Sequence, residues 1–251
     1  MDPAFSFRLK AFSFIVLCGV AGSAAATPST QIWIPSTDVQ KYLSVHLNLD
    51  TYVRTAEERD TSRLPPIVMV GPTVGVSPWE KIQLEVGFDA VFQGSTPLDR
   101  DPLYFHAKVG TPEGSVSWWT PALAVGIYNL GYKKNLTDQD VAYALLARTL
   151  PYLGRLSVGY YVGNDRVLRD ENGAAANHGI LASWDRTLTE LSDRLWLAVD
   201  FQGGRNLLSS VNFGVAWAFS ANMSAILGYD VYLNPDVAGQ NTLTVQIDVN
   251  L

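Results

Sequence analysis

Cysteine and histidine are scarce in this sequence, and acidic residues outnumber basic ones. The 251 residues include one cysteine and three histidines, His46, His106 and His178. The histidines lie far apart without the spacing of metal ligands, and there is no glycine-rich phosphate loop, so we expect no metal and no cofactor. The 18 Lys and Arg stand against 24 Asp and Glu, which gives a net charge of −6. This balance argues against nucleic acid as a partner, because nucleic-acid binding requires a basic surface.

The chain also lacks a long hydrophobic run. One short apolar stretch lies near the start, and nothing later approaches the roughly 20 apolar residues that a transmembrane helix needs. A charged n-region, this short stretch and the alanines at 24–26 predict a cleaved secretory signal peptide at 1–26. Cys18 lies inside that leader. We therefore expect one exported domain, 27–251, without cysteine and without disulfides.

The most regular stretch of the sequence is its last one. Apolar residues alternate there with polar ones, at Leu243, Val245, Ile247, Val249 and Leu251. A period of two indicates a β-strand with one apolar and one polar face. A chain end this apolar is typical of an outer-membrane β-barrel, whose last strand pairs with its first to close the cylinder.

Similar segments recur along the whole chain. We predict 12 strands, at 42–54, 66–76, 81–92, 103–111, 117–131, 140–150, 155–163, 178–185, 194–202, 208–219, 223–233 and 240–251. Segment 140–150 is also compatible with a helix. The connections after odd strands tend to be long and polar and those after even strands short, as in bacterial barrels. The predicted fold is all-β, a 12-stranded antiparallel up-and-down transmembrane β-barrel with both termini in the periplasm.

The residues on the two strand faces favour a membrane barrel over a soluble β-sandwich. The polar faces carry many small residues, which suit a narrow lumen. The apolar faces of the clearest strands carry no charge, and a Lys or Arg there would cost about 2–4 kcal/mol at the bilayer midplane. Outward aromatics near strand ends, among them Phe92, Trp119 and Trp217, would form interfacial girdles.

Three stretches are similar to small porin-like barrels of Gram-negative bacteria: QIWIPSTDVQ at 31–40, YFHAKVGTPE at 104–113 and GRLSVGYYVGN at 154–164. With the leader and the strand pattern, the chain resembles an outer-membrane β-barrel over its whole mature length. The resemblance implies export to the outer membrane, contact with its lipid and insertion by the barrel-assembly machinery, and it brings no function with it. Leu251 stands where such barrels usually end in Phe.

Charged residues on the inward faces are the candidate functional residues. We predict a lumen lined by Asp50, Lys81, Glu85, Asp89, His106, Lys108, Arg148, Arg155, Asp200, Asp230 and Asp248. Carboxylates outnumber bases in this set, which predicts a porin-like channel for passive diffusion of small solutes or ions with a mild cation preference.

A closed barrel is the alternative hypothesis. The same charges could form an ion-pair network that fills the lumen, and loops 55–65 and 164–177 would then bind a partner. Segment 27–40 or loop 164–177 could itself fold into the barrel. Trp33 and Pro35 suit a position at the membrane rim.

An enzyme is the third hypothesis. Some 12-stranded barrels are phospholipases that use His, Ser and Asn, and Ser44, His46 and Asn48 share one predicted strand face. Their order is reversed from that family and the face is lumenal, so we expect no enzyme. The oligomeric state stays open.

Overall fold

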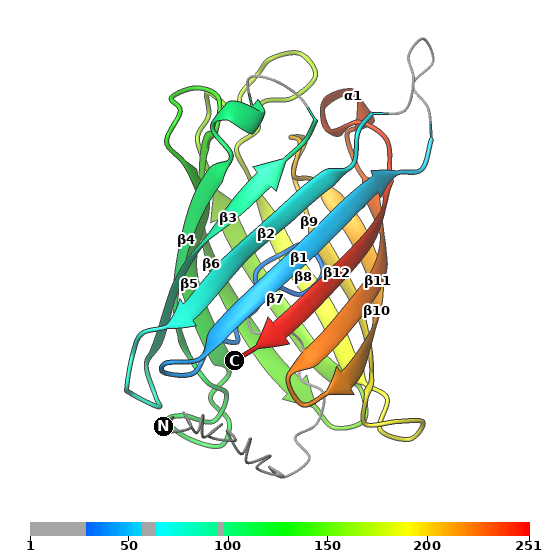
Figure 1. Ribbon diagram of the computed structural model, residues 1–251. Coiled ribbons are helices and arrows are strands. Elements are labelled where there is room, and N and C mark those ends of the chain that lie inside the picture. Colours follow the sequence, from blue (N-terminus) through cyan, green and yellow to red (C-terminus); the bar gives the residue numbers. More distant parts are fainter. Residues whose placement is uncertain (1–28, 57–63, 95–97) are drawn as a thin grey trace, which may run out of the picture.

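A closed barrel of antiparallel strands makes up the protein (Figure 1). The computed structural model describes residues 29–56, 64–94 and 98–251, so the predicted leader and part of loop 55–65 lie outside the described residues. Each strand pairs with its sequence neighbours, and the first also pairs with the last. The strands are β1 (Val45–Arg54), β2 (Ile67–Gly75), β3 (Gln83–Phe92), β4 (Leu103–Thr111), β5 (Ala122–Gly131), β6 (Asp138–Leu150), β7 (Gly154–Val162), β8 (His178–Thr187), β9 (Leu195–Gln202), β10 (Ser210–Ser220), β11 (Met223–Tyr232) and β12 (Thr242–Asn250). The predicted fold class is confirmed.

The segment compatible with a helix is a strand, β6. Val141, Tyr143, Leu145 and Ala147 are buried inside the barrel, while the residues between them are exposed. This burial has a period of two, and pairing with β5 and β7 satisfies the backbone on both sides.

Several strands begin later than their sequence pattern predicts, and in β5 and β3 the shift moves a side chain named above out of the strand. Pro121 cannot donate to a ladder, and β5 begins only after it, at Ala122. Trp119 therefore lies in the connection before β5, where it is 65% exposed, and not in the strand as predicted. β3 begins at Gln83, so Lys81 lies in the preceding bend and is exposed.

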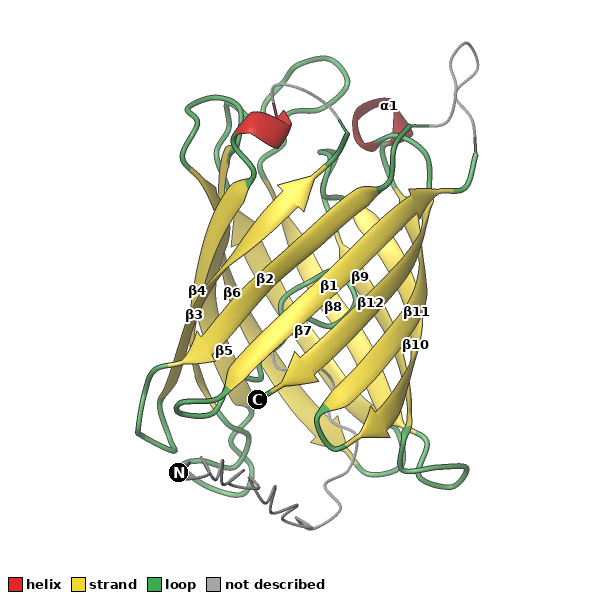
Figure 2. Cartoon of the chain, viewed as in Figure 1, coloured by secondary structure: helices red, strands yellow, loops and turns green. Residues whose placement is uncertain are grey.

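The connections after odd and after even strands lie at opposite ends of the barrel (Figure 2). Those after odd strands, including the one that holds the short helix α1 (Pro235–Ala238), gather at one end. Those after even strands are shorter on average and gather at the other end, which is also where the chain terminates (Figure 1). Within the described residues, no helix has the length and apolarity needed to cross a membrane.

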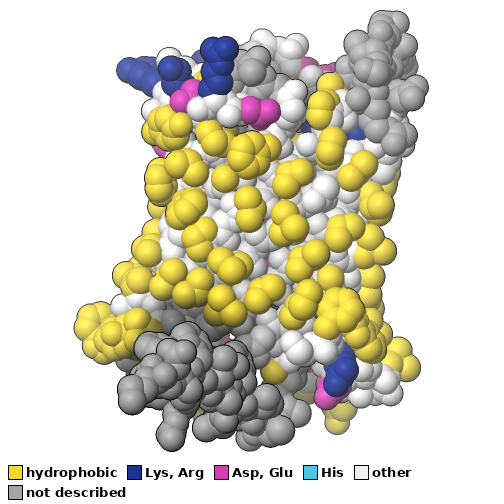
Figure 3. All heavy atoms as spheres, in the orientation of Figure 1, with side chains coloured by type: hydrophobic (Ala, Val, Ile, Leu, Met, Phe, Trp, Pro, Cys, Tyr) yellow, Lys and Arg dark blue, Asp and Glu magenta, His cyan; other side chains and the backbone are white. Residues whose placement is uncertain are grey.

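The outer face of the barrel is an apolar belt. Outward side chains such as Leu49, Val86, Phe213, Leu227 and Val245 are exposed although they are large and hydrophobic. Figure 3 shows hydrophobic side chains over the middle of the visible face, with the charged ones at its two ends. A continuous belt of this kind fits lipid rather than water.

Residues 29–41, upstream of β1, lie inside the barrel, where they are visible as a dark blue loop behind the front strands (Figure 1). We call residues 29–41 the inner segment. Ile32 and Ile34 are fully buried against inward side chains of the wall. The placement of Trp33 and Pro35 at the membrane rim is therefore wrong: the Trp33 ring packs inside, edge-to-face against Tyr52 and Tyr232.

Candidate functional site

The tip of the inner segment is a tight loop held by one carboxylate. Gln31 N–H donates to the Ile34 carbonyl at 2.8 Å, and Ser36 N–H donates to the Ser29 carbonyl at 3.2 Å. The backbone N–H groups of Ile32, Trp33 and Ile34 then converge on Asp200 Oδ2, at 2.8, 2.8 and 3.3 Å. Consecutive N–H groups that converge in this way form an anion-binding nest. Asp200 on β9 fills the nest and anchors the loop to the wall.

Two apolar contacts fix the same loop. Ile34 packs in a cluster with Tyr161 and Leu181, and Ile32 packs in another with Trp196 and Ile226. The wall makes room for Ile32 through Gly214 and Gly228, which face each other across β10 and β11. A Cβ at Gly214 would lie 2.8 Å from Ile32 Cδ1, so a larger residue there would displace the loop.

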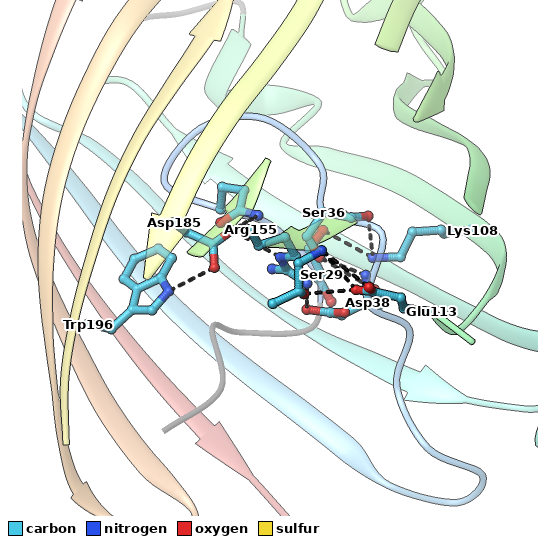
Figure 4. A network of polar contacts seen from close by, with 10 residues as sticks. Ser29, Ser36, Asp38, Lys108, Glu113, Arg155, Asp185 and Trp196 are labelled. Carbon is cyan, nitrogen blue, oxygen red and sulfur yellow. Dashed lines mark hydrogen bonds and ion pairs between the residues drawn. The ribbon is translucent and has the colours of Figure 1, made fainter. Parts of the chain in front are cut away.

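A buried ion pair holds the opposite side of the segment. Lys108 Nζ lies 3.1 Å from Glu85 Oε1 and also donates to the carbonyls of Ser29 and Ser36, at 3.2 and 3.4 Å. Glu85 Oε2 accepts from Gln40 N–H at 2.7 Å. Figure 4 shows Lys108 directed at Ser36. Both charges are thus committed to the inner segment, which they tie to β3 and β4.

A second ion pair continues this network on β7 and β8. Arg155 lies between Asp38 and Asp185, at 2.6 and 2.9 Å (Figure 4). Asp185 also accepts from Gln31 Nε2 at 3.1 Å and from Trp196 Nε1 at 3.2 Å. Every charge in this group has an opposite charge or several donors beside it. This pairing offsets the free-energy cost of burying the charges.

A cavity of about 540 Å³ remains on the β1–β5 side of the lumen. The inner segment forms part of its wall through Trp33 and Pro35, and the connection that carries α1 lies at its mouth. Its charged lining consists of Asp50, Glu85, Asp89, Asp236, Asp248, Arg54 and Lys108. Acidic side chains therefore outnumber Arg and Lys in its lining, five to two.

Comparisons with known proteins identify the architecture. A scan against models of protein families and a search of curated proteins find no match. Among solved structures, a KdgM porin in complex with disordered oligogalacturonate matches with a TM-score of 0.50 and 7% identity, over 82% of this chain and 98% of that chain. An outer membrane channel from Pseudomonas putida F1 matches with a TM-score of 0.49 and 11% identity, over 85% and 97%. Outer membrane phospholipase A from Escherichia coli matches with 0.49 and 12%, over 82% and 92%.

These likenesses concern the fold. The protein has the fold of outer-membrane β-barrels. In such barrels the short turns face the periplasm and the long loops face outward. By this rule we assign the end that carries α1 as the extracellular end and the end where the chain terminates as the periplasmic end.

The barrel brings six of the predicted lumenal residues together around the cavity: Asp50, Glu85, Asp89, His106, Lys108 and Asp248. Arg155 and Asp200 are inside as well, but they bind the inner segment. Asp230 is buried in the wall, where Thr242 Oγ1 donates to it at 2.6 Å. Arg148 pairs with Glu113 at 3.0 Å near the periplasmic rim, and Lys81 lies outside the strands.

The sequence pattern missed several residues that hold the inner segment. Gln31, Trp33, Asp38, Gln40 and Asn212 all take part, and none was assigned to the lumenal site. The alternating Ile32-Trp33-Ile34 triplet and the glycines of β10 and β11 were the available signals. In the chain, Ile32 and Trp33 lie more than 160 residues from Asp200, which they contact. Spacing in the sequence alone could not predict such contacts.

Loop 163–177 covers part of the extracellular mouth. Its Leu168 is fully buried in the cluster around Ile34. Glu171 in the same loop accepts from Asn234 Nδ2 at 2.7 Å and pairs with Arg205, which joins three extracellular loops. The pKa of Glu171 is lowered by a hydrogen bond from its own backbone and by those from Asn234 and Arg205.

The serine and histidine considered for catalysis do not form a pair. Ser44 Oγ donates to the Lys41 carbonyl at 2.7 Å and to Gln40 Oε1 at 3.1 Å. His46 Nδ1 lies 3.1 Å from Asn250 Oδ1, and Nε2 lies 3.3 Å from Asp248 Oδ1. Both imidazole nitrogens thus face β12 and not the hydroxyl that a nucleophilic mechanism would have to activate. Among the described residues no cluster of His, Cys, Asp or Glu could hold a metal ion.

Proposed function

We propose that the protein is a porin-like channel for passive diffusion of small solutes or ions, with a mild cation preference. The observation that carries the proposal is the cavity between the inner segment and β1–β5, open towards the extracellular loops and lined by an excess of carboxylates. The inner segment fills the other half of the lumen. It would act as a fixed constriction that confines the path to one side of the barrel.

Asp50 and Asp89 would set the cation preference. Glu85 pairs with Lys108 at 3.1 Å, and Asp248 lies 3.3 Å from His46 Nε2. Asp50 has the uncharged amide of Asn48 beside it at 3.1 Å, and the imidazole of His106 lies farther from Asp89, at 3.8 Å. Rings of carboxylates whose charge is not neutralised attract cations into a narrow pore.

Single-channel recording in a planar bilayer tests this function. We expect reproducible ohmic steps of current. In a salt gradient, the reversal potential should have the sign that indicates cation selectivity. The variants Asp50→Asn and Asp89→Asn should move that potential towards zero, whereas Asp193→Asn, on an exposed periplasmic turn, should not. Silence from protein that heat-shifted gel mobility shows to be folded would reject the channel.

A closed barrel that binds a partner through its extracellular loops is the second candidate. The burial of the inner segment favours it, because Ile32, Ile34 and the paired charges remove much of the free lumen. Silent but folded protein in the bilayer would support this function. We propose no enzymatic role, although one structure of similar fold is a phospholipase. Cleavage of a leader at 1–26 and recognition of β12 by the insertion machinery complete the proposal.

A further inference from the structure

The extracellular part of the cavity has aromatic walls. The Trp33 ring meets Tyr52 at a centroid distance of 5.4 Å and 88°, and Tyr232 at 5.8 Å and 79°. Tyr128 and Tyr143 form a second pair at 5.8 Å, and all five rings line the cavity. Aromatic faces attract cations through the ring quadrupole and also accept apolar groups. Arg54 already lies 5.3 Å from the Tyr232 ring centre, which illustrates this use of the wall.

The deeper part of the cavity is acidic and incompletely satisfied. Asp50, Asp89 and Asp248 converge there from β1, β3 and β12. Asp248 is only 4% exposed, yet its Oδ2 has no hydrogen-bond partner among the described residues. A buried carboxylate oxygen without a donor is costly, so a donor supplied by a ligand would stabilise it.

Both bases of the cavity are engaged with its wall. Lys108 pairs with Glu85 and donates to two carbonyls of the inner segment. Arg54 donates to the Gln240 carbonyl at 2.5 Å and lies against Tyr232, while its buried Nε has no hydrogen-bond partner among the described residues. An anionic ligand would meet five carboxyl groups and two engaged bases, whereas a cation would meet both carboxylates and ring faces.

We propose that the cavity is a binding site for an amphipathic organic cation. The ammonium or amidinium group would lie among Asp50, Asp89 and Asp248, where it could donate to Asp248 Oδ2, and the apolar body would lie against Trp33 and Tyr52. A volume of about 540 Å³ accommodates a ligand of this kind. The inference rests on the proposed function in that such cations would be the solutes that the channel selects.

Isothermal titration calorimetry on the full protein in detergent tests the site independently of transport. The probe is benzylammonium, compared with benzenesulfonate and benzyl alcohol at the same ring size. We expect binding of the cation only. The near-isosteric variants Asp50→Asn and Asp89→Asn should each weaken it about tenfold, the range of a charge-assisted contact. Asp193→Asn should bind as the unmodified protein does.

Conductance recorded on the same preparations separates the two proposals. Binding of the cation with block of the current supports both. Binding without any conductance supports the site and rejects the channel. Conductance without binding, equal binding of benzenesulfonate, or binding that both Asp→Asn variants leave unchanged would overturn the site, even where the channel stands.

Discussion

Asp200 is the residue on which the inner segment depends most. It accepts three backbone N–H groups of the segment and the amide of Asn212 at 2.6 Å. An unsatisfied buried donor costs about 1–3 kcal/mol. We expect Asp200→Ala to lower the free energy of unfolding by about 3 kcal/mol or more, with a smaller loss in Asp200→Asn, which keeps an acceptor.

Urea unfolding followed by gel mobility would measure this loss. Asp193→Asn is the matched control, because it removes the same charge from an exposed turn. Equal stability of Asp200→Ala and the unmodified protein would show that the segment is held by other contacts.

Gly214 makes the clearest steric prediction. Because its missing Cβ leaves the space that Ile32 occupies, Gly214→Ala should cost about 1–3 kcal/mol, as overpacking does. A smaller residue at position 32 should relieve the clash. In a double-mutant cycle, Ile32→Val should therefore cost less in the Gly214→Ala background than alone. Additive losses would mean that the two side chains do not meet.

At the scale of elements, the strands were predictable, whereas the inner segment was foreseen only as one of two segments that could fold into the barrel, without its contacts. Period-two alternation located all 12 strands, because one face of each meets lipid and the other meets the lumen. Errors arose at the strand ends. Pro121, for example, keeps Trp119 out of β5, which begins at Ala122. Residues 29–41 form no ladder of their own, and their positions depend on Asp185, Asp200 and Lys108 far along the chain.

A covalent link tests whether the inner segment must move. The predicted mature chain has no cysteine, so the pair Ile32→Cys and Gly214→Cys would be its only thiols, placed where the wall and the loop touch. If the path runs on the β1–β5 side past a fixed segment, oxidation should leave the conductance unchanged. Loss of current on oxidation and its return on reduction would show that the segment is a gate. The single-cysteine variants are the controls.

For the whole molecule, the apolar belt predicts that a charged side chain placed in it lowers the free energy of unfolding. Val245 lies in β12 with its side chain in the belt. Val245→Lys should lower the free energy of unfolding by about 2–4 kcal/mol in a bilayer, because the ammonium would enter hydrocarbon. Thr189→Lys, in an exposed periplasmic turn, should change it little. If Val245→Lys and Thr189→Lys lowered the free energy of unfolding equally in lipid vesicles, the position of the belt would be contradicted.

The charge of the lumen is also a property of the whole molecule. Counting inward residues predicted an acidic interior, and the cavity lining is acidic. Counting could not tell which charges would be neutralised, because pairs such as Arg155 with Asp38 join the wall to a segment outside it. Only the folded arrangement separates Asp50 and Asp89 from the charges that hold the inner segment.

The inner segment also constrains the order in which the barrel can be assembled. It precedes β1 in the chain, yet Gln31 and Ile32 bind Asp185, Asp200 and Gln246, which lie 154, 168 and 214 residues further on. Contacts over such separations form late, because the intervening chain must first be ordered. The inner segment thus waits for the last strands, and a seam between β1 and β12 that closed too early would shut it out of the lumen.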